Sequence, residues 1–375
     1  MKQIVVLSGG NYYSDLVRIE QMLPGFLSKH YQVLFIEYPK FSRIIRLIAG
    51  KQTYLEKVNN QLTVIHTFGL LPCGRSVAQI NLLNHRLNYF LVKNLINKKY
   101  LLLSFTPEAV LIPLLMSGAN RVYYWVIDDY VTLPFWNNPW QKRQFRYLDK
   151  LMVSGSDRII AASTTLYEQY RKDKPQTFYF PTPADLSDVK IIDNEIPGDL
   201  KAMEGLKIGF IGAFYDWRID IDLLLKTAAY YSNHSFIFIG SFKVRKKYLR
   251  DRLYSMKNLH FLDYKKPEYL SLYINAFDVC LIPYRMNAYG ISAYPVKINE
   301  YLYAGKPVVT TALPALKDLA NRKLIYWADN NRTFIKYIGK AIRENDPELK
   351  KARKKTASAN SWQARSAALL KLLEQ

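Results

Sequence analysis

Short apolar runs alternate with longer mixed stretches along the whole chain. In the first half, runs of strand length occupy 4–8, 32–38, 62–67, 122–127 and 158–163. A second series starts at 207 (KIGFIGAF) and continues at 235, 258, 279, 307 and 324. Apolar strands separated by stretches of helix length are typical of a parallel sheet covered on both faces. The pattern therefore predicts an α/β protein with two Rossmann-like domains.

A polar, acidic stretch with Pro197-Gly198 inside it separates the two series and is interpreted as a linker. The length of 375 residues also exceeds one ordinary core of roughly 100 to 200 residues. We predict an N-terminal domain at 1–185, a linker at 186–206, a C-terminal domain at 207–355 and a C-terminal helix at 356–375.

The tail from Lys350 has a helical pattern. It opens with KKARKK, which we interpret as a solvated charge run. Trp362, Ala367, Leu370 and Leu373 then recur at steps of three to five residues. We expect this helix to dock one apolar face, packing back toward the N-terminal domain.

No apolar run approaches the roughly 20 residues of a membrane-spanning helix. The N-terminal run ends in glycines and lacks the features of a signal peptide, so we expect a cytoplasmic protein. Of the two cysteines, Cys280 lies in a strand-like run (FDVCLIPY), where a thiol behaves as a small buried hydrophobe. Neither Cys73 nor Cys280 indicates a disulfide or a metal site.

The charge is strongly positive, with 53 Lys and Arg against 31 Asp and Glu and a formal net charge of +22. Such an excess favours an anionic partner. No acidic residue lies between Glu56 and Glu108, and the basic residues there are Lys57, Arg75, Arg86, Lys93, Lys98 and Lys99. One expectation is that the first domain docks through this stretch on the anionic inner face of the cell membrane, as a peripheral protein. A plain solvated face explains the stretch equally well. A nucleic-acid partner is not expected, because no DNA- or RNA-binding module is present.

Ligands bind beyond the carboxyl ends of strands in doubly wound sheets, so the residues after each strand are the first candidates. The first strand ends in Gly9, Gly10 and Asn11, where glycines would let the backbone approach a ligand and leave helix amides facing it. A plain tight turn is the alternative. The spaced glycines of dinucleotide-binding folds are absent here.

Two adjacent carboxylates, Asp128 and Asp129, follow the run at 122–127. A carboxylate there could accept the proton of a sugar hydroxyl, and the like charges would raise one pKa toward a useful range. Alternatively one Asp caps the next helix while the other pairs with Arg143 or Arg146. Two carboxylates without further ligands make a poor metal site, so no metal is expected.

In the second half, Gly212 ends a strand and Arg218 follows it beside Tyr215 and Trp217, a combination suited to a diphosphate and a sugar. Further on, a helix is predicted from about Tyr294 to Gly305, after a flexible stretch.

Pro295 suits the first turn of this helix, and its N-terminus around 291–293 would offer free amides to phosphate. Lys297 and Glu300 lie near one face, where they would simply pair, or Glu300 would accept hydrogen bonds from a ribose.

The segment PVKINEYLYAGKPVV resembles the donor-binding helix of group-1, GT4-like glycosyltransferases, whose GT-B fold sets two Rossmann-like domains facing across a cleft. Together with YWVIDDY at 124–130 and IGFIGAF at 208–214, it looks most like the teichuronic-acid-type glycosyltransferases. By this resemblance Glu300 would grip the donor ribose, Lys297 would meet donor phosphate, and Asp128 or Asp129 would match an acidic pair of the first domain.

Two departures accompany the resemblance. Ser292 stands where retaining members carry a second Glu, and Phe180-Pro181-Thr182-Pro183 replaces an Asn-Gly pair after the last strand of the first domain. The family favours a retaining hexosyl transfer, whereas Ser292 leaves the stereochemistry open.

The resemblance implies transfer from a nucleotide-diphosphate sugar to a glycan or lipid-linked acceptor, in cell-surface polysaccharide or glycolipid synthesis. A nucleotide-sugar epimerase or hydrolase on the same frame is the alternative. The candidates are Asp128 and Asp129 for catalysis; Gly212, Arg218, Tyr289, Gly290, Ile291, Ser292, Lys297 and Glu300 for the donor; and Gly9, Gly10 and Asn11 for the first-domain loop.

Overall fold

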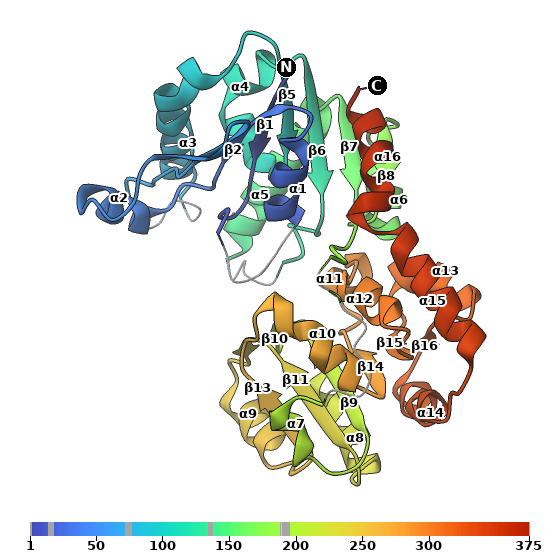
Figure 1. Ribbon diagram of the computed structural model, residues 1–375. Coiled ribbons are helices and arrows are strands. Elements are labelled where there is room, and N and C mark those ends of the chain that lie inside the picture. Colours follow the sequence, from blue (N-terminus) through green and yellow to red (C-terminus); the bar gives the residue numbers. More distant parts are fainter. Residues whose placement is uncertain are drawn as a thin grey trace. The chain divides into compact units, whose positions relative to one another are not determined.

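The structure is a computed structural model that describes residues 2–13, 19–71, 77–133, 138–187, 189 and 196–374. The chain divides into two compact units, Met1–Pro181 and Thr182–Gln375. Each unit is built around its own twisted sheet (Figure 1).

Unit 1 contains a sheet of eight strands in the part of the chain that is described. Their order is β3 (Leu55–Asn59), β4 (Leu62–Ile65), β2 (Gln32–Ile36), β1 (Gln3–Leu7), β5 (Tyr100–Ser104), β6 (Arg121–Val126), β7 (Arg158–Ala161) and β8 (Thr177–Tyr179). All pairs are parallel except β3 with β4. The strands predicted in this half are confirmed, while β3, β5 and β8 were not predicted.

The helices of unit 1 connect these parallel strands. They are α1 (Ile19–Leu27), α2 (Phe41–Ile48), α3 (Ala78–Val92), α4 (Pro113–Ser117), α5 (Pro139–Gly155) and α6 (Thr164–Tyr170), with 3₁₀ turns η2 (Lys93–Leu95) and η3 (Pro107–Leu111). Local capping sets where two of them begin. The side chains of Asn138 and Ser163 accept hydrogen bonds from the first-turn amides of α5 and α6.

Unit 2 contains a fully parallel sheet of six strands among the described residues. Its order is β13 (Leu259–Leu262), β11 (Ser235–Ile239), β9 (Lys207–Ile211), β14 (Val279–Ile282), β15 (Val308–Thr311) and β16 (Tyr326–Ala328), beside a small pair of β10 (Phe214–Tyr215) and β12 (Phe242–Lys243). This order, third-second-first-fourth-fifth-sixth, is that of the Rossmann fold. The doubly wound α/β class predicted from the sequence is confirmed.

The helices of unit 2 are α7 (Gly198–Lys201), α8 (Ile221–Tyr230), α9 (Lys247–Tyr254), α10 (Pro267–Ala276), α11 (Ala288–Ser292), α12 (Lys297–Tyr303), α13 (Lys317–Asn321), α14 (Asn331–Ile342), α15 (Pro347–Ala359) and α16 (Trp362–Glu374), with the 3₁₀ turn η4 (Pro314–Leu316).

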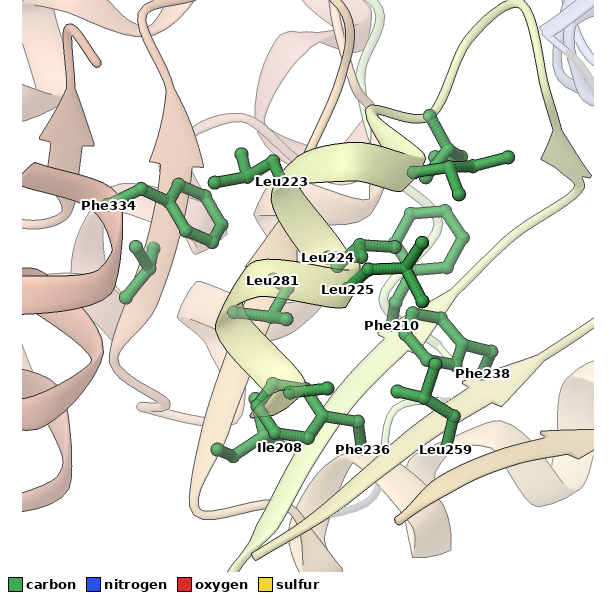
Figure 2. Packing of buried hydrophobic residues seen from close by; sticks show 14 of the residues in the cluster. Ile208, Phe210, Leu223, Leu224, Leu225, Phe236, Phe238, Leu259, Leu281 and Phe334 are labelled. Atoms are coloured by element: carbon green, nitrogen blue, oxygen red, sulfur yellow. The ribbon is translucent and has the colours of Figure 1, made fainter. Parts of the chain in front are cut away.

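Alternating residues of the unit 2 strands enter two separate cores. Phe236 and Phe238 of β11 pack under α8 with Leu223 and Leu224, as Figure 2 shows. Their neighbours in the same strand face the opposite core. Both faces are covered, which explains why these strands are continuous apolar runs rather than alternating ones.

Cys280 lies in the second of these cores and is fully buried, as predicted; burial raises the pKa of its thiol to about 12. Cys73 and Arg75 lie outside the described residues.

The predicted linker at 186–206 falls partly outside the described residues, and its end forms α7, with Leu200 buried in the core of unit 2. None of the helices in the described ranges has the length and hydropathy to cross a bilayer.

The interpretation of KKARKK as a solvated run is wrong for one residue. Arg353 is fully buried, and its guanidinium forms two hydrogen bonds with the carboxylate of Glu344, one of them at 2.8 Å. Its Nε also donates to the carbonyl of Leu324 at 2.8 Å. Arg353 therefore holds α15 against the rest of unit 2.

The buried face of α16 also differs from the expected one. Trp362 and Leu373 are buried as expected. Leu369 is buried with them, whereas Ala367 is exposed.

Candidate functional site

The strand order of unit 2 reverses between β9 and β14, and this reversal is where doubly wound sheets bind ligands. Gly212 follows β9 with a φ of 153°, and Gly240 follows β11 with a φ of 131°. A Cβ on Gly240 would lie 2.5 Å from the carbonyl oxygen of Gly212. Glycine is thus required where the two strand ends approach each other.

Two loops meet at this reversal, one after β10 and one after β14. The amide of Arg285 donates to the carbonyl of Arg218 at 2.7 Å, and its Nε donates to the carbonyl of Ile219 at 3.0 Å. The side-chain amide of Asn287 donates to the carbonyl of Trp217 at 3.0 Å. These bonds fix Arg218 beside the carboxyl end of β14.

Arg218 lies among aromatic rings. Its guanidinium is 5.1 Å from the ring centre of Trp217, 5.2 Å from Tyr289, 5.6 Å from Tyr284 and 6.0 Å from Tyr215, and it donates to the hydroxyl of Tyr289. The aromatic faces favour the cation and restrict its movement. The predicted grouping of Arg218 with Tyr215 and Trp217 is present, and Tyr289 joins it.

The segment expected to be flexible around Gly290 is the short helix α11. The side chain of Asn287 caps it by accepting from the amide of Gly290 at 2.8 Å. A Cβ on Gly290 would lie 1.9 Å from the carbonyl oxygen of Arg285, so only glycine fits.

The expectation that 291–293 presents free amides is wrong for two residues. The amide of Ile291 donates to the carbonyl of Asn287 at 3.0 Å, and that of Ala293 donates to the carbonyl of Gly290 at 3.2 Å. The α12 helix begins later, at Lys297, so this segment is not its N-terminus. Its end agrees with the prediction, because Gly305 follows it with a φ of 74°.

Ser292 is buried, and its hydroxyl donates to the carbonyl of Tyr289 at 2.8 Å. The residue that replaces the family's second Glu is thus part of the α11 structure.

Lys297 and Glu300 form the ion pair that their spacing allowed. The ammonium lies 2.7 and 2.8 Å from the two carboxylate oxygens, and both side chains remain partly accessible. The buried hydroxyl of Tyr301 accepts a hydrogen bond from the amide of Ile211 at 2.8 Å. This contact holds α12 against the carboxyl end of β9.

In unit 1 the corresponding strand reversal lies between β1 and β5, and the Gly9–Asn11 segment follows β1 there. The amide of Gly10 donates to the hydroxyl of Ser8 at 3.0 Å, and its carbonyl accepts from the amide of Tyr38 at 3.1 Å. Residues 11–13, which follow the glycines, are not helical, so the glycines do not lead directly into a helix. The segment is a loop fastened to β2.

A buried charged cluster, which the sequence reading did not single out, fixes this loop. The guanidinium of Arg43 donates to Asn11 Oδ1 at 2.5 Å and lies 2.6 Å from Glu37 Oε2. Glu37 Oε1 accepts from the amide of Tyr12 at 2.5 Å. His66 lies between two carboxylates, with Nδ1 3.0 Å from Glu37 and Nε2 2.9 Å from Glu56.

The imidazolium form of His66 suits this position, because only it can donate from both nitrogens. The hydrogen bond with Glu37 raises the pKa of His66, burial opposes it, and the bond with Glu56 adds to the rise. The hydroxyl of Tyr13 donates to Glu56 at 2.6 Å, and this bond, followed by that with His66, lowers the pKa of Glu56. No local motif marks the cluster. The only signal was that Glu37 and His66 are polar residues near the ends of the apolar runs 32–38 and 62–67.

The two predicted carboxylates differ in their surroundings. Asp129 is buried, and its Oδ1 accepts from the amides of Val131 and Thr132 at 3.0 and 3.2 Å. Asp129 thus closes a local turn rather than capping α5, whose cap is Asn138. Asp128 is partly exposed. Both carboxylates follow β6, and the Gly9–Asn11 loop follows β1. Because β5 lies between these two strands, β1 and β6 are roughly 10 Å apart.

Asp149 of α5 is a further buried carboxylate near this edge. It accepts from the hydroxyls of Tyr124 at 2.8 Å and Tyr170 at 3.0 Å. Burial raises its pKa to about 6, and the charge of Asp129 contributes to the rise. The two Tyr bonds act in the opposite direction.

Across the described ranges, no group of three or more His, Cys, Asp or Glu side chains is arranged to hold a metal ion.

Part of unit 2 is similar to a known protein family. Residues 205–344 match the family model of glycosyl transferases group 1. TuaH of Bacillus subtilis, which carries the name of a teichuronic acid biosynthesis glycosyltransferase, is 24% identical over 166 residues, 44% of this chain. The match spans less than half of TuaH, 42% of its length.

Solved structures resemble the whole chain. Sucrose-phosphate synthase from Thermosynechococcus elongatus superposes with a TM-score of 0.77 at 14% identity, covering 100% of this chain and 99% of that one. Anabaena HepE in complex with UDP gives 0.70 at 13%, covering 100% of both chains. The trehalose 6-phosphate synthase of Burkholderia multivorans gives 0.71 at 9%, covering 100% and 98%. Residues 205–344 of unit 2 are therefore similar to the group-1 glycosyl transferases, and the chain as a whole has the GT-B fold.

Proposed function

We propose that this protein transfers a hexosyl group from a nucleotide-diphosphate sugar to a glycan or lipid-linked acceptor, in the synthesis of a cell-surface polysaccharide or glycolipid. The observation that carries the proposal is the arrangement at the β9–β14 reversal. Arg218 is fixed there by aromatic rings, and α12 is held against the end of β9 by the Ile211–Tyr301 hydrogen bond. The UDP held by the Anabaena relative and the name of TuaH support a nucleotide donor and a cell-surface product.

In this proposal unit 2 holds the donor. Arg218 and Lys297 would neutralise the diphosphate, whose charge grows as the bond between the anomeric carbon and the phosphate oxygen breaks. Glu300 would then leave Lys297 and accept hydrogen bonds from the ribose hydroxyls. The ion pair of the free protein holds the two side chains in place until the donor arrives.

Unit 1 would present the acceptor. The acceptor hydroxyl forms the new bond to the anomeric carbon and gives its proton to a carboxylate. We assign this role to Asp128, because its side chain is partly exposed whereas Asp129 is buried and closes a local turn. Ser292 is buried and uncharged, so a nucleophilic carboxylate at that position is not part of this reaction.

Calorimetric titration of the full chain with a panel of nucleotide-diphosphate sugars, followed by product analysis with and without acceptor glycans, tests the proposal. We expect saturable binding of one donor class and a product only when an acceptor is present. Conversion of the donor without acceptor would indicate an epimerase or a hydrolase instead.

A further inference from the structure

The helix α3 carries polar side chains on its buried face and apolar side chains on its exposed face. Asn81, Asn84, His85 and Asn88 are buried. Leu83 and Phe90 are 54% and 63% exposed, on a stripe that also contains Arg86. A surface helix of a globular protein ordinarily has the opposite arrangement.

Hydrogen bonds fix this orientation. The side chain of Asn88 accepts from the amide of Phe68 at 3.1 Å and donates to its carbonyl at 2.7 Å. Asn84 accepts from the amide of Leu70 at 2.9 Å, and Asn81 donates to Glu108 at 2.8 Å. Turning α3 about its axis would break all of these bonds, so its apolar face stays outward.

The α2 helix adds a second exposed apolar surface next to it. Ile48 and Ile45 are 82% and 57% exposed, whereas Arg43 on the other face is buried in the charged cluster. The first residue of α2, Phe41, and Asn84 of α3 both lie near Gly69, where a Cβ would be 3.2 Å from the Phe41 nitrogen and from the Asn84 side-chain nitrogen.

The stretch of chain that contains these apolar side chains is rich in basic residues. The exposed ones are Lys40, Arg46, Lys51, Lys57, Arg86, Lys93, Lys98 and Lys99. Glu56 is the only acidic residue between Glu37 and Glu108, and it is already bonded to His66 and Tyr13. The ammonium of Lys93 lies 4.1 Å from the ring centre of Phe90, so charge and apolar surface are interleaved.

We propose that this α2–α3 face docks on an anionic lipid bilayer, with Ile45, Ile48, Leu83, Phe90 and Leu91 entering the headgroup region. Large exposed apolar side chains favour the acyl boundary, and the surrounding Lys and Arg favour anionic headgroups. Its positive charge gives the face an electrostatic match to such a surface. The proposal concerns binding alone and does not depend on the transfer reaction.

Co-sedimentation of the full chain with phosphatidylglycerol-containing vesicles and with pure phosphatidylcholine vesicles tests it. We expect binding to the anionic vesicles that weakens with added salt. Ile48→Ser with Phe90→Ser should weaken it about tenfold or more, and Arg46→Gln with Lys93→Gln about fivefold for each charge removed. Both pairs are exposed, so thermal unfolding should be unchanged.

Tyr230→Ser and Lys226→Gln, two exposed changes in unit 2, are the matched controls and should bind vesicles like the unchanged chain. Equal binding to both vesicle types, no binding, or undiminished binding of the α2–α3 variants would overturn the proposal. A change in oligomeric state of Ile48→Ser/Phe90→Ser without loss of vesicle binding would assign the face to contact with another copy of the chain. Nucleotide-sugar titration of the same variants should be unaffected, which separates this result from the fate of the proposed function.

Discussion

The ammonium of Lys297 lies within 2.8 Å of both carboxylate oxygens of Glu300, one turn along α12. Such a pair at a partly exposed position contributes about 0.2 to 1 kcal/mol to stability, so its functional and structural roles can be separated. Lys297→Ala is expected to leave the unfolding free energy within about 1 kcal/mol and to weaken donor binding, because a phosphate-binding charge is lost. Asp251→Ala, which breaks the exposed Lys247–Asp251 pair on α9, is the control and should bind the donor normally. Undiminished donor binding by Lys297→Ala would remove Lys297 from the site.

Gly290→Ala is expected to disrupt α11. Its Cβ would lie 1.9 Å from the carbonyl oxygen of Arg285, and relieving that overlap should cost about 1 to 3 kcal/mol. Tyr289 and Arg218 would shift with it, so donor affinity should fall as well. Gly198→Ala, where a Cβ meets nothing within 4 Å, is the matched change. Denaturant unfolding and donor titration of both variants measure the difference, and equal stability of the two would refute this account of Gly290.

The charged cluster of unit 1 makes stability depend on pH. The folded-state pKa of His66 is raised above its usual 6.5, so its stabilisation is fully present below that value and is lost as the pH rises through the folded pKa. Glu56 has the opposite sign, because its pKa is lowered from 4.5 and its stabilisation is lost as the pH falls.

Between these limits, near pH 4.5 to 6.5, the cluster should contribute most. Unfolding midpoints measured across this range and above pH 6.5 should decline above that value in the unchanged chain, with a smaller decline in His66→Gln. An identical alkaline decline in His66→Gln would show that His66 does not titrate as described.

Arg353→Met is expected to destabilise unit 2 by about 3 to 5 kcal/mol, because it leaves the buried carboxylate of Glu344 without its partner. Replacing both, with Arg353→Met and Glu344→Leu, should recover much of the loss. Lys351→Met, an exposed change in the same charge run, should alter the unfolding free energy by less than about 0.5 kcal/mol. Similar effects of Arg353→Met and Lys351→Met on the unfolding free energy would show that Arg353 is solvated like the rest of the run.

Substitutions of the two carboxylates after β6, Asp128 and Asp129, should have different effects because the two residues have different roles. Asp129→Ala removes the acceptor of two amides and should lower stability by about 1 kcal/mol, whereas Asp128→Asn should keep stability and lose turnover. Steady-state rates of Asp128→Asn and Asp129→Asn make the comparison. A larger loss of turnover in Asp129→Asn would reverse the assignment.

The sequence predicted the parts of this molecule that follow from local patterns. Strands covered on both faces, such as β9 and β11, are uninterrupted apolar runs, and Gly305 ends α12 as a glycine after a helix should. The spacing of Lys297 and Glu300 also allowed their pairing.

Features that depend on long-range contacts could not be predicted in this way. Arg43, Glu37 and His66 are brought together only by the parallel pairing of β2 with β4 and the return of α2. Arg353 resembles its charged neighbours in sequence, and only the fold reveals Glu344 beside it. The amides of Ile291 and Ala293 were expected to be free because composition alone does not predict a helix in this segment. The Asn287 side chain caps the helix α11 that forms there.

A double-mutant cycle between Glu300 and the ribose tests the central claim most directly. Affinities of the unchanged chain and of Glu300→Gln would be measured for UDP and for 2′,3′-dideoxy-UDP, with UDP chosen because the Anabaena relative holds it. If Glu300 grips the ribose, removing either partner should cost about 1.5 to 3 kcal/mol, and removing the second should cost little more. Two outcomes would contradict a donor site built on Glu300. One is that the affinity losses from Glu300→Gln and from removing the ribose hydroxyls simply add, and the other is that Glu300→Gln leaves the affinity for UDP unchanged.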